Sequence, residues 1–314
     1  MNQFLFIGGK GGVGKTTMAT TAAIQRAMAG ERTLVVSSDP AHSTSDLFEQ
    51  PIGDDPTPID GYDRLDAIEI DPDAAVEDHL QETKRALTDQ VSPAIVNAIE
   101  PQLELAHDSA GAYEAALFDR VIDILQTART YDRVVFDTAP TGGTLRLLAL
   151  PDALETWIDR LLEKRTRSIE LFESAAIGDR TPRRTRAGDP IVERLQERKD
   201  RFEFAATTLR SDTSFYLVVT PDELSIRETQ RTSDRLSANG LCVAGLIVNK
   251  LTPEPDESER GAGAAFLRAR RATERKHLDA IESIGPPIVA TVQSQHKPPA
   301  GDQLEELSQA ITLE

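Results

Sequence analysis

The chain has 314 residues, enough for one large α/β domain or two smaller ones, and it carries a formal net charge of −17 at pH 7. This acidic balance argues against nonspecific binding to nucleic acid or to an anionic membrane surface as the main activity. The sequence contains one cysteine, Cys242, which excludes a disulfide framework and an internal cluster of thiolates.

Lysine is rare in this acidic chain, with only eight lysines against 52 aspartate and glutamate residues. Such a composition predicts adaptation to a salty cytoplasm, where ions screen the self-repulsion of the protein. No stretch approaches the roughly 18 apolar residues of a membrane-spanning helix. A cleaved signal sequence would remove the glycine-rich segment that begins at Gly8. We therefore expect a cytoplasmic protein without a membrane span.

The N-terminal segment predicts a strand, a glycine-rich loop and a helix. Phe4–Ile7 is an apolar run with the length of a buried parallel strand, and the alanine-rich stretch Thr16–Ala29 is typical of a helix. Between them, Gly9–Thr16 matches the phosphate-binding pattern G-x4-G-K-[ST]. The glycines permit tight turns that aim consecutive N–H groups at a phosphate, and the helix N-terminus adds its dipole. A glycine-rich hairpin is the alternative, but it leaves both flanks unexplained.

Strand-like and helical segments alternate along most of the remaining chain. The further strands are expected at Thr33–Ser37, Leu65–Ile70, Arg133–Phe136, Phe215–Val219, Val243–Val248 and Pro287–Val292. This alternation predicts an α/β fold with a mostly parallel, doubly wound sheet, as in a P-loop nucleotide hydrolase. The chemistry of such sheets gathers at the carboxyl ends of the strands.

Two long segments interrupt this alternation. Residues of about 73–129 and of about 152–210 have helical composition and no expected strand. They are too long for simple crossovers, so we interpret them as a helical subdomain built from two insertions. Only one phosphate loop is present, so residues 1–314 are interpreted as a single P-loop domain.

Carboxylates follow two of the expected strands. Lys15 of the loop is expected to reach the β- and γ-phosphates, and the Thr16 hydroxyl to ligate Mg²⁺. Asp39 follows the second strand and can orient or deprotonate the attacking water, although an Asp-Pro pair also simply starts turns. Asp137 ends the strand YDRVVF, where this fold places an acid that organises Mg²⁺.

Several motifs together resemble the family of arsenite-pump and tail-anchored-protein-targeting ATPases, within the larger MinD/ParA-like group of deviant-loop ATPases. The motifs are GGKGGVGKTT (8–17), SSDPAHSTSDLF (37–48), IEIDPDAA (68–75), DTAPTGGTLRLL (137–148) and VNK (248–250). The resemblance runs from residue 2 to the C-terminus, more weakly in the helical insertions. The joint presence of DPAHS and DTAPTG separates this family from its MinD/ParA relatives.

The resemblance implies a homodimeric ATPase that uses ATP and Mg²⁺. Lys10 is similar to the signature lysine that reaches the phosphates of the partner's nucleotide, and Asn249 to the residue that reads the adenine edge. By the same resemblance, the catalytic residues are Asp39, Lys10 and Lys15, and the Mg²⁺ ligands are Thr16, Asp39 and Asp137. The expected nucleotide-binding residues are Gly9, Lys10, Gly11, Gly12, Val13, Gly14, Lys15, Thr16, Thr17 and Asn249.

The sequence departs from this family where clients and partners are concerned. Cys242 alone cannot supply a trithiolate arsenite site, and its place in the apolar run LCVAGLIV predicts a buried structural cysteine. The segment 261–267 has no cysteine where targeting relatives carry a CxxC zinc site, so we expect no zinc. Gly143 stands where many relatives have a histidine. One helical stripe, Ile191, Leu195, Phe202, Ala206 and Leu209, is more typical of core packing than of a client groove.

Four functions remain open from the sequence. The leading one is a dimeric Mg²⁺-ATPase whose cycle opens and closes a helical surface for a protein client or a membrane-protein partner. The alternatives are a chaperone that targets tail-anchored membrane proteins, a soluble energiser of a metalloid efflux pump, and a non-hydrolysing nucleotide-dependent scaffold.

Overall fold

A computed structural model describes most of the chain outside the two inserted segments. The described residues are 2–38, 43–71, 74–77, 81, 110–137, 159–160, 163–164, 167, 190–297, 299–309, 311 and 313. Asp39, Gly143 and most of the range 73–109 lie outside them.

The centre of the fold is one sheet of eight strands in the order β3-β4-β2-β5-β1-β6-β7-β8. The strands are β1 (Phe4–Gly9), β2 (Thr33–Ser37), β3 (Thr57–Pro58), β4 (Leu65–Glu69), β5 (Arg133–Asp137), β6 (Thr213–Val219), β7 (Val243–Leu251) and β8 (Ile288–Gln293). All neighbours pair in parallel except β3, which pairs antiparallel with β4. The predicted mostly parallel sheet is therefore confirmed.

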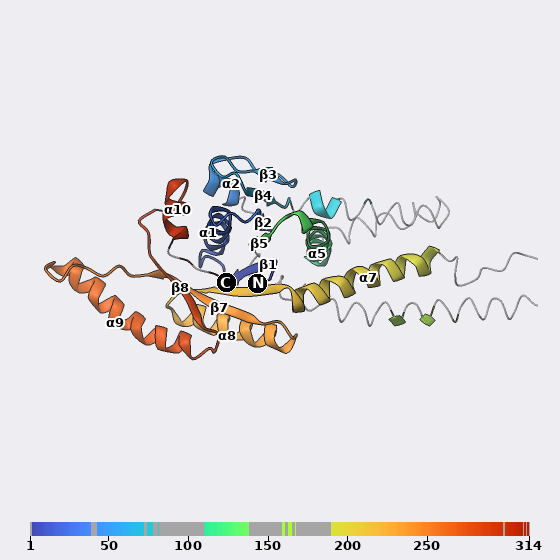
Figure 1. Ribbon diagram of the computed structural model, residues 1–314. Coiled ribbons are helices and arrows are strands. Elements are labelled where there is room, and N and C mark those ends of the chain that lie inside the picture. The colour runs from blue at the N-terminus through green and yellow to red at the C-terminus, as the bar shows by residue number, and fades with distance from the viewer. Residues whose placement is uncertain are drawn as a thin grey trace, which may run out of the picture.

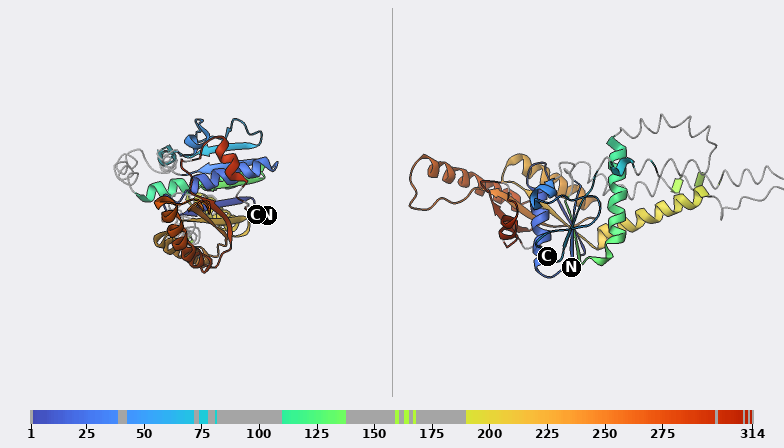
Figure 2. Two further views of the ribbon diagram at one scale, coloured as in Figure 1. Left: turned by 90° about the vertical axis from the view of Figure 1, so that its left-hand side faces the viewer. Right: turned by 90° about the horizontal axis from the view of Figure 1, so that it is seen from above.

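Helices cover both faces of the sheet (Figures 1 and 2). They are α1 (Lys15–Met28), α2 (Ser43–Phe48), α5 (Ala110–Thr127), α7 (Pro190–Ser211), α8 (Glu223–Ala238), α9 (Ala262–Glu282) and α10 (Asp302–Ser308), with a short 3₁₀ helix, η1 (Ala128–Thr130). In Figure 1 the strands run from β3 at the top to β7 and β8 at the bottom; α1 and α10 lie to the left of β2 and β5, and α5 lies to their right.

The alternation of side chains along β1 explains why both faces are buried. Leu5 and Ile7 point into the core shared with α1 and α10, while Phe4 and Phe6 point into the core shared with α5, α7 and α8. Successive side chains of a strand face opposite sides of the sheet, so an uninterrupted apolar run fits a strand covered on both faces. This packing places the carboxyl end of β1 rigidly in the middle of the sheet.

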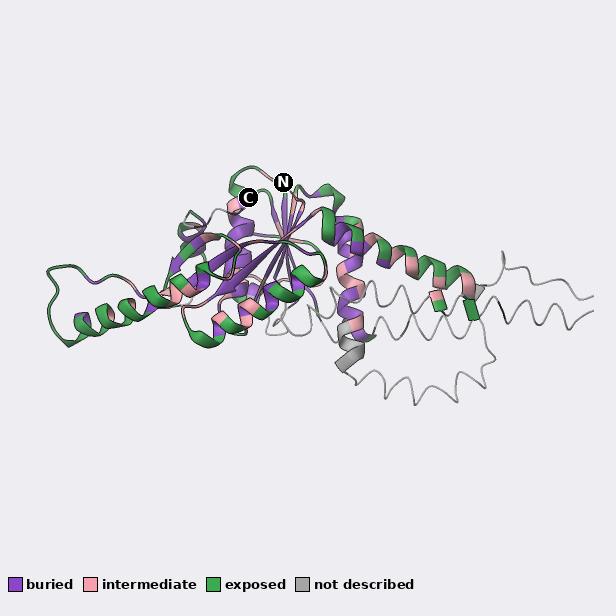
Figure 3. Ribbon diagram, turned by 90° about the horizontal axis from the view of Figure 1, so that it is seen from below, coloured by how far each residue is buried: buried purple, intermediate pink, exposed green. Residues whose placement is uncertain are grey.

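Helices α5 and α7, which belong to the two inserted ranges, pack on each other and on the sheet. The rings of Phe118 and Phe202 stack with centroids 5.8 Å apart. The Arg201 guanidinium lies 2.7 Å from an oxygen of Asp123, which ties the two helices together at their surface. The described part of the α7 stripe confirms the expected core packing, because Phe202, Ala206 and Leu209 are buried. Toward its N-terminus, α7 extends beyond the sheet and is more exposed (Figure 3).

Candidate functional site

The glycine-rich loop lies between β1 and α1, as the sequence predicts. Gly12 and Gly14 have φ angles of +79° and +96°, in the left-handed region that glycine tolerates best. A Cβ atom on Gly9 would lie 2.5 Å from the backbone oxygen of Val218 on the neighbouring strand β6. The loop therefore needs glycine for its turns at two positions and for a close backbone approach at a third.

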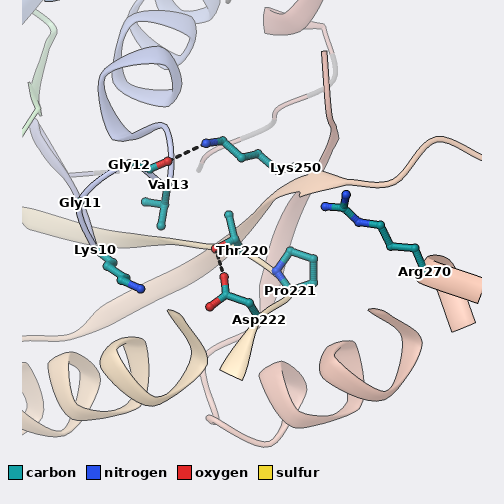
Figure 4. A pocket seen from close by; sticks show the side chains of 9 residues that line it. All are labelled: Lys10, Gly11, Gly12, Val13, Thr220, Pro221, Asp222, Lys250 and Arg270. Atoms are coloured by element: carbon teal, nitrogen blue, oxygen red, sulfur yellow. Dashed lines mark hydrogen bonds between the residues drawn. The ribbon is translucent and has the colours of Figure 1, made fainter. Parts of the chain in front are cut away.

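The two lysines of the loop point in different directions. Lys15 is buried, and its ammonium donates to the backbone oxygen of Lys10 at 3.4 Å. The N–H of Val13 donates to the same oxygen at 3.5 Å. Both bonds are long for N–H···O hydrogen bonds. The side chain of Lys10 instead extends away from the loop, toward Asp222 (Figure 4).

Lys10 extends into a cavity of about 320 Å³ on the outer side of the loop. The cavity is lined by Lys10, Gly11, Gly12, Val13, Thr220, Pro221, Asp222, Lys250 and Arg270. Three of these side chains are cations and one is a carboxylate, so the cavity suits an anionic group. Because it is open on the surface, a group from another molecule can reach it.

Asp222 is the acid of this outer cavity and also the N-cap of α8. Its carboxylate accepts hydrogen bonds from the Ser225 N–H at 2.9 Å and from the Thr220 hydroxyl at 2.6 Å. Burial alone raises the pKa of Asp222, but these hydrogen bonds and the positive charge of Lys10 outweigh it and hold the pKa below its ordinary value. Asp222 is therefore an anion at neutral pH and faces the cationic Lys10.

A second cavity of about 400 Å³ lies on the other side of the loop. Its lining residues are Gly14, Thr17, Met18, Asn249, Lys250, Val292, Gln293, Ser294, Gln295, His296, Lys297, Pro299 and Leu307. This cavity begins at the first turn of α1 and runs along the end of β8. Val292 and Gln293 of β8 contribute to this lining.

Asn249 lines this second cavity and also holds the loop. Its side-chain N–H donates to the backbone oxygen of Val13 at 2.8 Å, and its side-chain oxygen accepts from the Lys250 N–H at 2.8 Å. An amide has two donor hydrogens and two acceptor lone pairs. One of each remains for a ligand, which is the pattern that matches the N6 and N7 edge of adenine.

Asp137 lies at the carboxyl end of β5, beside the loop. It is almost fully buried, and its side chain accepts from the Ser37 hydroxyl at 3.3 Å. The N–H and the hydroxyl of Ser38 donate to its backbone oxygen at 3.2 and 3.1 Å. Strand β5 pairs with β1, so Asp137 stands next to Ile7 at the start of the loop. A buried carboxylate here and the hydroxyl of Thr16 are hard oxygen donors, and they fit Mg²⁺.

Sequence reasoning missed Glu69, a buried carboxylate at the end of β4. Its two oxygens accept from the Thr44 N–H at 3.1 Å and from the Ser45 hydroxyl at 2.5 Å. These bonds fasten the first turn of α2, which follows directly on the segment that contains Asp39. The only signal in the sequence is a glutamate at the end of an apolar strand in IEID, and its partners cannot be read from the sequence.

One sequence prediction is wrong, because Cys242 is exposed and not buried. Strand β7 begins only at Val243, and its neighbours Leu241 and Val243 take the inward positions. Alternation therefore turns Cys242 toward solvent. Among the helices that the structure describes, none is long and apolar enough to cross a membrane.

The sequence is similar to known proteins over most of its length. The family model described as anion-transporting ATPase matches residues 2–312. ATPase get3 of Neurospora crassa is 32% identical over 286 residues, which is 90% of this chain and 81% of that protein. The putative arsenical pump-driving ATPase of Halobacterium salinarum is 35% identical over 283 residues, which is 90% of this chain but 39% of that protein. With a phosphate loop between a central parallel strand and a helix, and this family match, the chain belongs to the anion-transporting ATPase family and is an ATPase.

Proposed function

We propose that the chain hydrolyses ATP with Mg²⁺ as a homodimer, in which Lys10 of each protomer acts on the nucleotide of the other. The observation that carries this proposal is the divergence of the two loop lysines. Lys15 turns inward to the loop, whereas Lys10 extends into the outer cavity toward Asp222, away from the cavity that Asn249 lines. A cation supplied by a facing protomer stabilises charge on the transferring phosphoryl group, as an arginine finger does.

The remaining roles in this proposal follow the positions of the side chains. Lys15 and the N–H groups at the start of α1 bind the phosphates, and Asn249 pairs with the adenine edge. Thr16 and Asp137 would hold Mg²⁺, which neutralises charge between the β- and γ-phosphates. Asp39, which lies outside the described residues, orients the attacking water. Glu69 holds the first turn of α2, the helix that follows Asp39 in the sequence.

The partner of this ATPase is proposed to be a protein client that contacts the helical insertions. Helix α7 belongs to the second inserted range, is anchored in the core at Phe202 and Leu209, and extends outward from the sheet toward its N-terminus. Two ion pairs, Arg198–Asp119 and Arg201–Asp123, tie α7 to α5. A thiolate site for arsenite needs several cysteines, and the chain contributes only the exposed Cys242. We therefore favour delivery of a hydrophobic protein segment over metalloid efflux.

A mixing experiment tests whether Lys10 acts across a dimer. Lys10→Ala keeps Lys15 and is expected to bind ATP but not to hydrolyse it, and Lys15→Ala is expected to lose ATP binding. Each variant alone is inactive. In a mixture, the Lys10→Ala protomer of a mixed dimer holds ATP and receives Lys10 from its partner. Hydrolysis should then return to at most about a quarter of the wild-type rate, because random pairing makes at most half of the dimers mixed and each mixed dimer has one complete site.

The control mixes Lys10→Ala with the double variant Lys10→Ala/Lys15→Ala, which supplies no Lys10 and should stay inactive. If Lys10→Ala alone hydrolyses ATP at the wild-type rate, the action across a dimer is refuted. Light scattering with and without ATP tests the dimer itself, which we expect to depend on nucleotide. Arsenite should leave the rate unchanged. If a single turnover of bound ATP yields no ADP in the wild type, the chain is a nucleotide-dependent scaffold instead.

A further inference from the structure

Lys250 has an unusual backbone conformation for a residue with a long side chain. Its φ angle is +60°, and among the described residues only Glu49 shares a positive φ without being glycine. The pairing between β7 and β8 shifts register between Val248 and Leu251, so Lys250 lies in an irregularity of the strand. A left-handed conformation costs about 1–2 kcal/mol for such a residue, and it persists only where the surrounding contacts fix it.

The strained conformation directs the Lys250 side chain back to the phosphate loop. Its ammonium donates to the backbone oxygen of Gly12 at 2.6 Å (Figure 4). The preceding residue, Asn249, holds the next backbone oxygen of the loop, that of Val13, at 2.8 Å. Two consecutive residues at the end of β7 thus hold two consecutive carbonyl groups of the loop from outside.

Holding these carbonyls also fixes the N–H groups that a phosphate needs. A peptide unit is planar and trans, so its C=O and N–H point in opposite directions. When Lys250 holds the Gly12 oxygen outward, the N–H of Val13 is turned toward the inside of the loop. Asn249 does the same for the N–H of Gly14 through the Val13 oxygen. Oriented N–H groups form the anion-binding concavity of such a loop.

Lys250 also lines both cavities of the site. The outer cavity contains Lys10, and the other contains Asn249. The Lys250 N–H donates to the Asn249 side-chain oxygen at 2.8 Å, so the two holding residues also support each other. One short segment therefore links base recognition to the shape of the phosphate loop.

We propose that Lys250 is a positioning residue of the phosphate loop, which holds the Gly12 carbonyl outward and thereby aims the Val13 N–H at the nucleotide phosphates. The inference rests on the proposed function in that the ligand is taken to be ATP. Because Lys250 acts on the loop and not on the γ-phosphate, it strengthens the binding of ATP and ADP equally. The binding of adenosine, which has no phosphate, is independent of it.

Three substitutions of Lys250 separate its ammonium from its backbone. Lys250→Met keeps the length of the side chain but donates no hydrogen bond. Lys250→Arg keeps a donor and should restore most of the binding. Lys250→Asn accepts a positive φ readily, but its side chain is too short to reach the Gly12 oxygen. Lys276→Met, on the exposed surface of α9, removes the same charge and serves as the matched control.

The readouts are the affinities for MgADP and adenosine by calorimetry, the steady-state parameters for ATP, and the amide NMR signals of Val13 and Gly14 without nucleotide. A charge-assisted hydrogen bond supports a loss of about tenfold in MgADP affinity for Lys250→Met and Lys250→Asn. Adenosine affinity should stay constant, KM for ATP should rise by the same factor as the MgADP dissociation constant, and kcat should change less. The Val13 and Gly14 signals should move in Lys250→Met but not in Lys276→Met.

Several results would overturn the inference. If Lys250→Met binds MgADP as tightly as the wild type, Lys250 does not contribute to the binding of the phosphates. Weaker MgADP binding without a shift of the Val13 signal would mean that Lys250 contacts a phosphate directly. If only kcat falls, Lys250 acts on the γ-phosphate. If adenosine affinity falls by the same factor as MgADP affinity, the substitution has disturbed the whole nucleotide site and not the phosphate loop alone. A failure of the proposed function would be seen in other measurements: the wild-type chain would not hydrolyse ATP, or its hydrolysis would not depend on Lys10 of a partner protomer.

Discussion

Replacing Gly14 by alanine tests how closely the phosphate loop and Asn249 fit together. Gly14 precedes α1 with φ +96° and ψ +33°. A Cβ atom at this position would lie 2.5 Å from the side-chain nitrogen of Asn249, closer than real Cβ contacts allow. Gly14→Ala therefore strains the backbone and also pushes Asn249 away from the Val13 oxygen that it holds.

The expected cost is the sum of these two effects. A left-handed alanine costs about 1–2 kcal/mol relative to glycine. Losing the hydrogen bond from Asn249, with the buried Val13 oxygen left unpaired, costs about 1–3 kcal/mol more. The sum is about 3 kcal/mol, and each kcal/mol lowers the melting temperature by about 2–4 °C in a chain somewhat smaller than this one. We therefore expect Gly14→Ala to melt about 6 °C below the wild type without nucleotide.

The neighbouring glycines provide matched controls for this prediction. Gly12 has φ +79°, but a Cβ atom added there would meet no other atom within 4 Å, so Gly12→Ala reports the backbone strain alone. Gly11 has open space and no left-handed φ, so Gly11→Ala should melt like the wild type. The melting temperatures of Gly14→Ala, Gly12→Ala and Gly11→Ala are compared without nucleotide. The ratio of kcat/KM for ATP to kcat/KM for GTP should fall only in Gly14→Ala, because only this variant displaces Asn249. If Gly14→Ala is as stable as Gly12→Ala, the contact with Asn249 does not matter.

Three further predictions concern groups around the sheet. Glu69→Gln should lower both the melting temperature and kcat, because a neutral amide holds the first turn of α2 about 1 kcal/mol less tightly. Burial, followed by the hydrogen bond to Asp66, raises the pKa of Tyr131 to about 12. Stability should therefore fall as the pH rises from about 10, the unfolded pKa, toward about 12, and Tyr131→Phe should remove this fall in melts across that range. Asp222→Asn keeps the cap of α8 but removes the charge that faces Lys10, so ATP-dependent dimers should tighten a few-fold in sedimentation, by roughly 1 kcal/mol or less; weaker dimers would contradict this.

Local patterns in the sequence predict the strands and the phosphate loop well. The apolar run of β1, the glycines and the alanine-rich helix α1 are neighbours in the chain, so their local preferences agree with the fold. Strand β3 escapes prediction because Thr57–Pro58 is only two residues long and depends on pairing with β4. Cys242 is misjudged for a related reason, since one residue decides whether alternation points it inward or outward.

The supporting residues of the site are harder to predict because their partners are distant in the chain. Lys250 lies 238 residues after Gly12, and Glu69 lies 25 residues after Thr44. The order of the strands brings these pairs together, and that order places β1 between β5 and β6. A sequence shows which residues can do chemistry, but the contacts that aim them depend on this strand order.

The placement of lysines connects the composition of the chain to its site. Four of the eight lysines, Lys10, Lys15, Lys250 and Lys297, belong to the loop or line its two cavities. At a distance, the net charge of −17 repels a nucleotide, which is itself an anion. This repulsion is screened beyond about 10 Å at 0.1 M salt and beyond about 3 Å at 1 M, whereas bonds from lysines inside the site act at contact. Rising ionic strength therefore weakens the repulsion more than the binding, and an acidic surface with a lysine-rich site favours nucleotide entry in a salty medium.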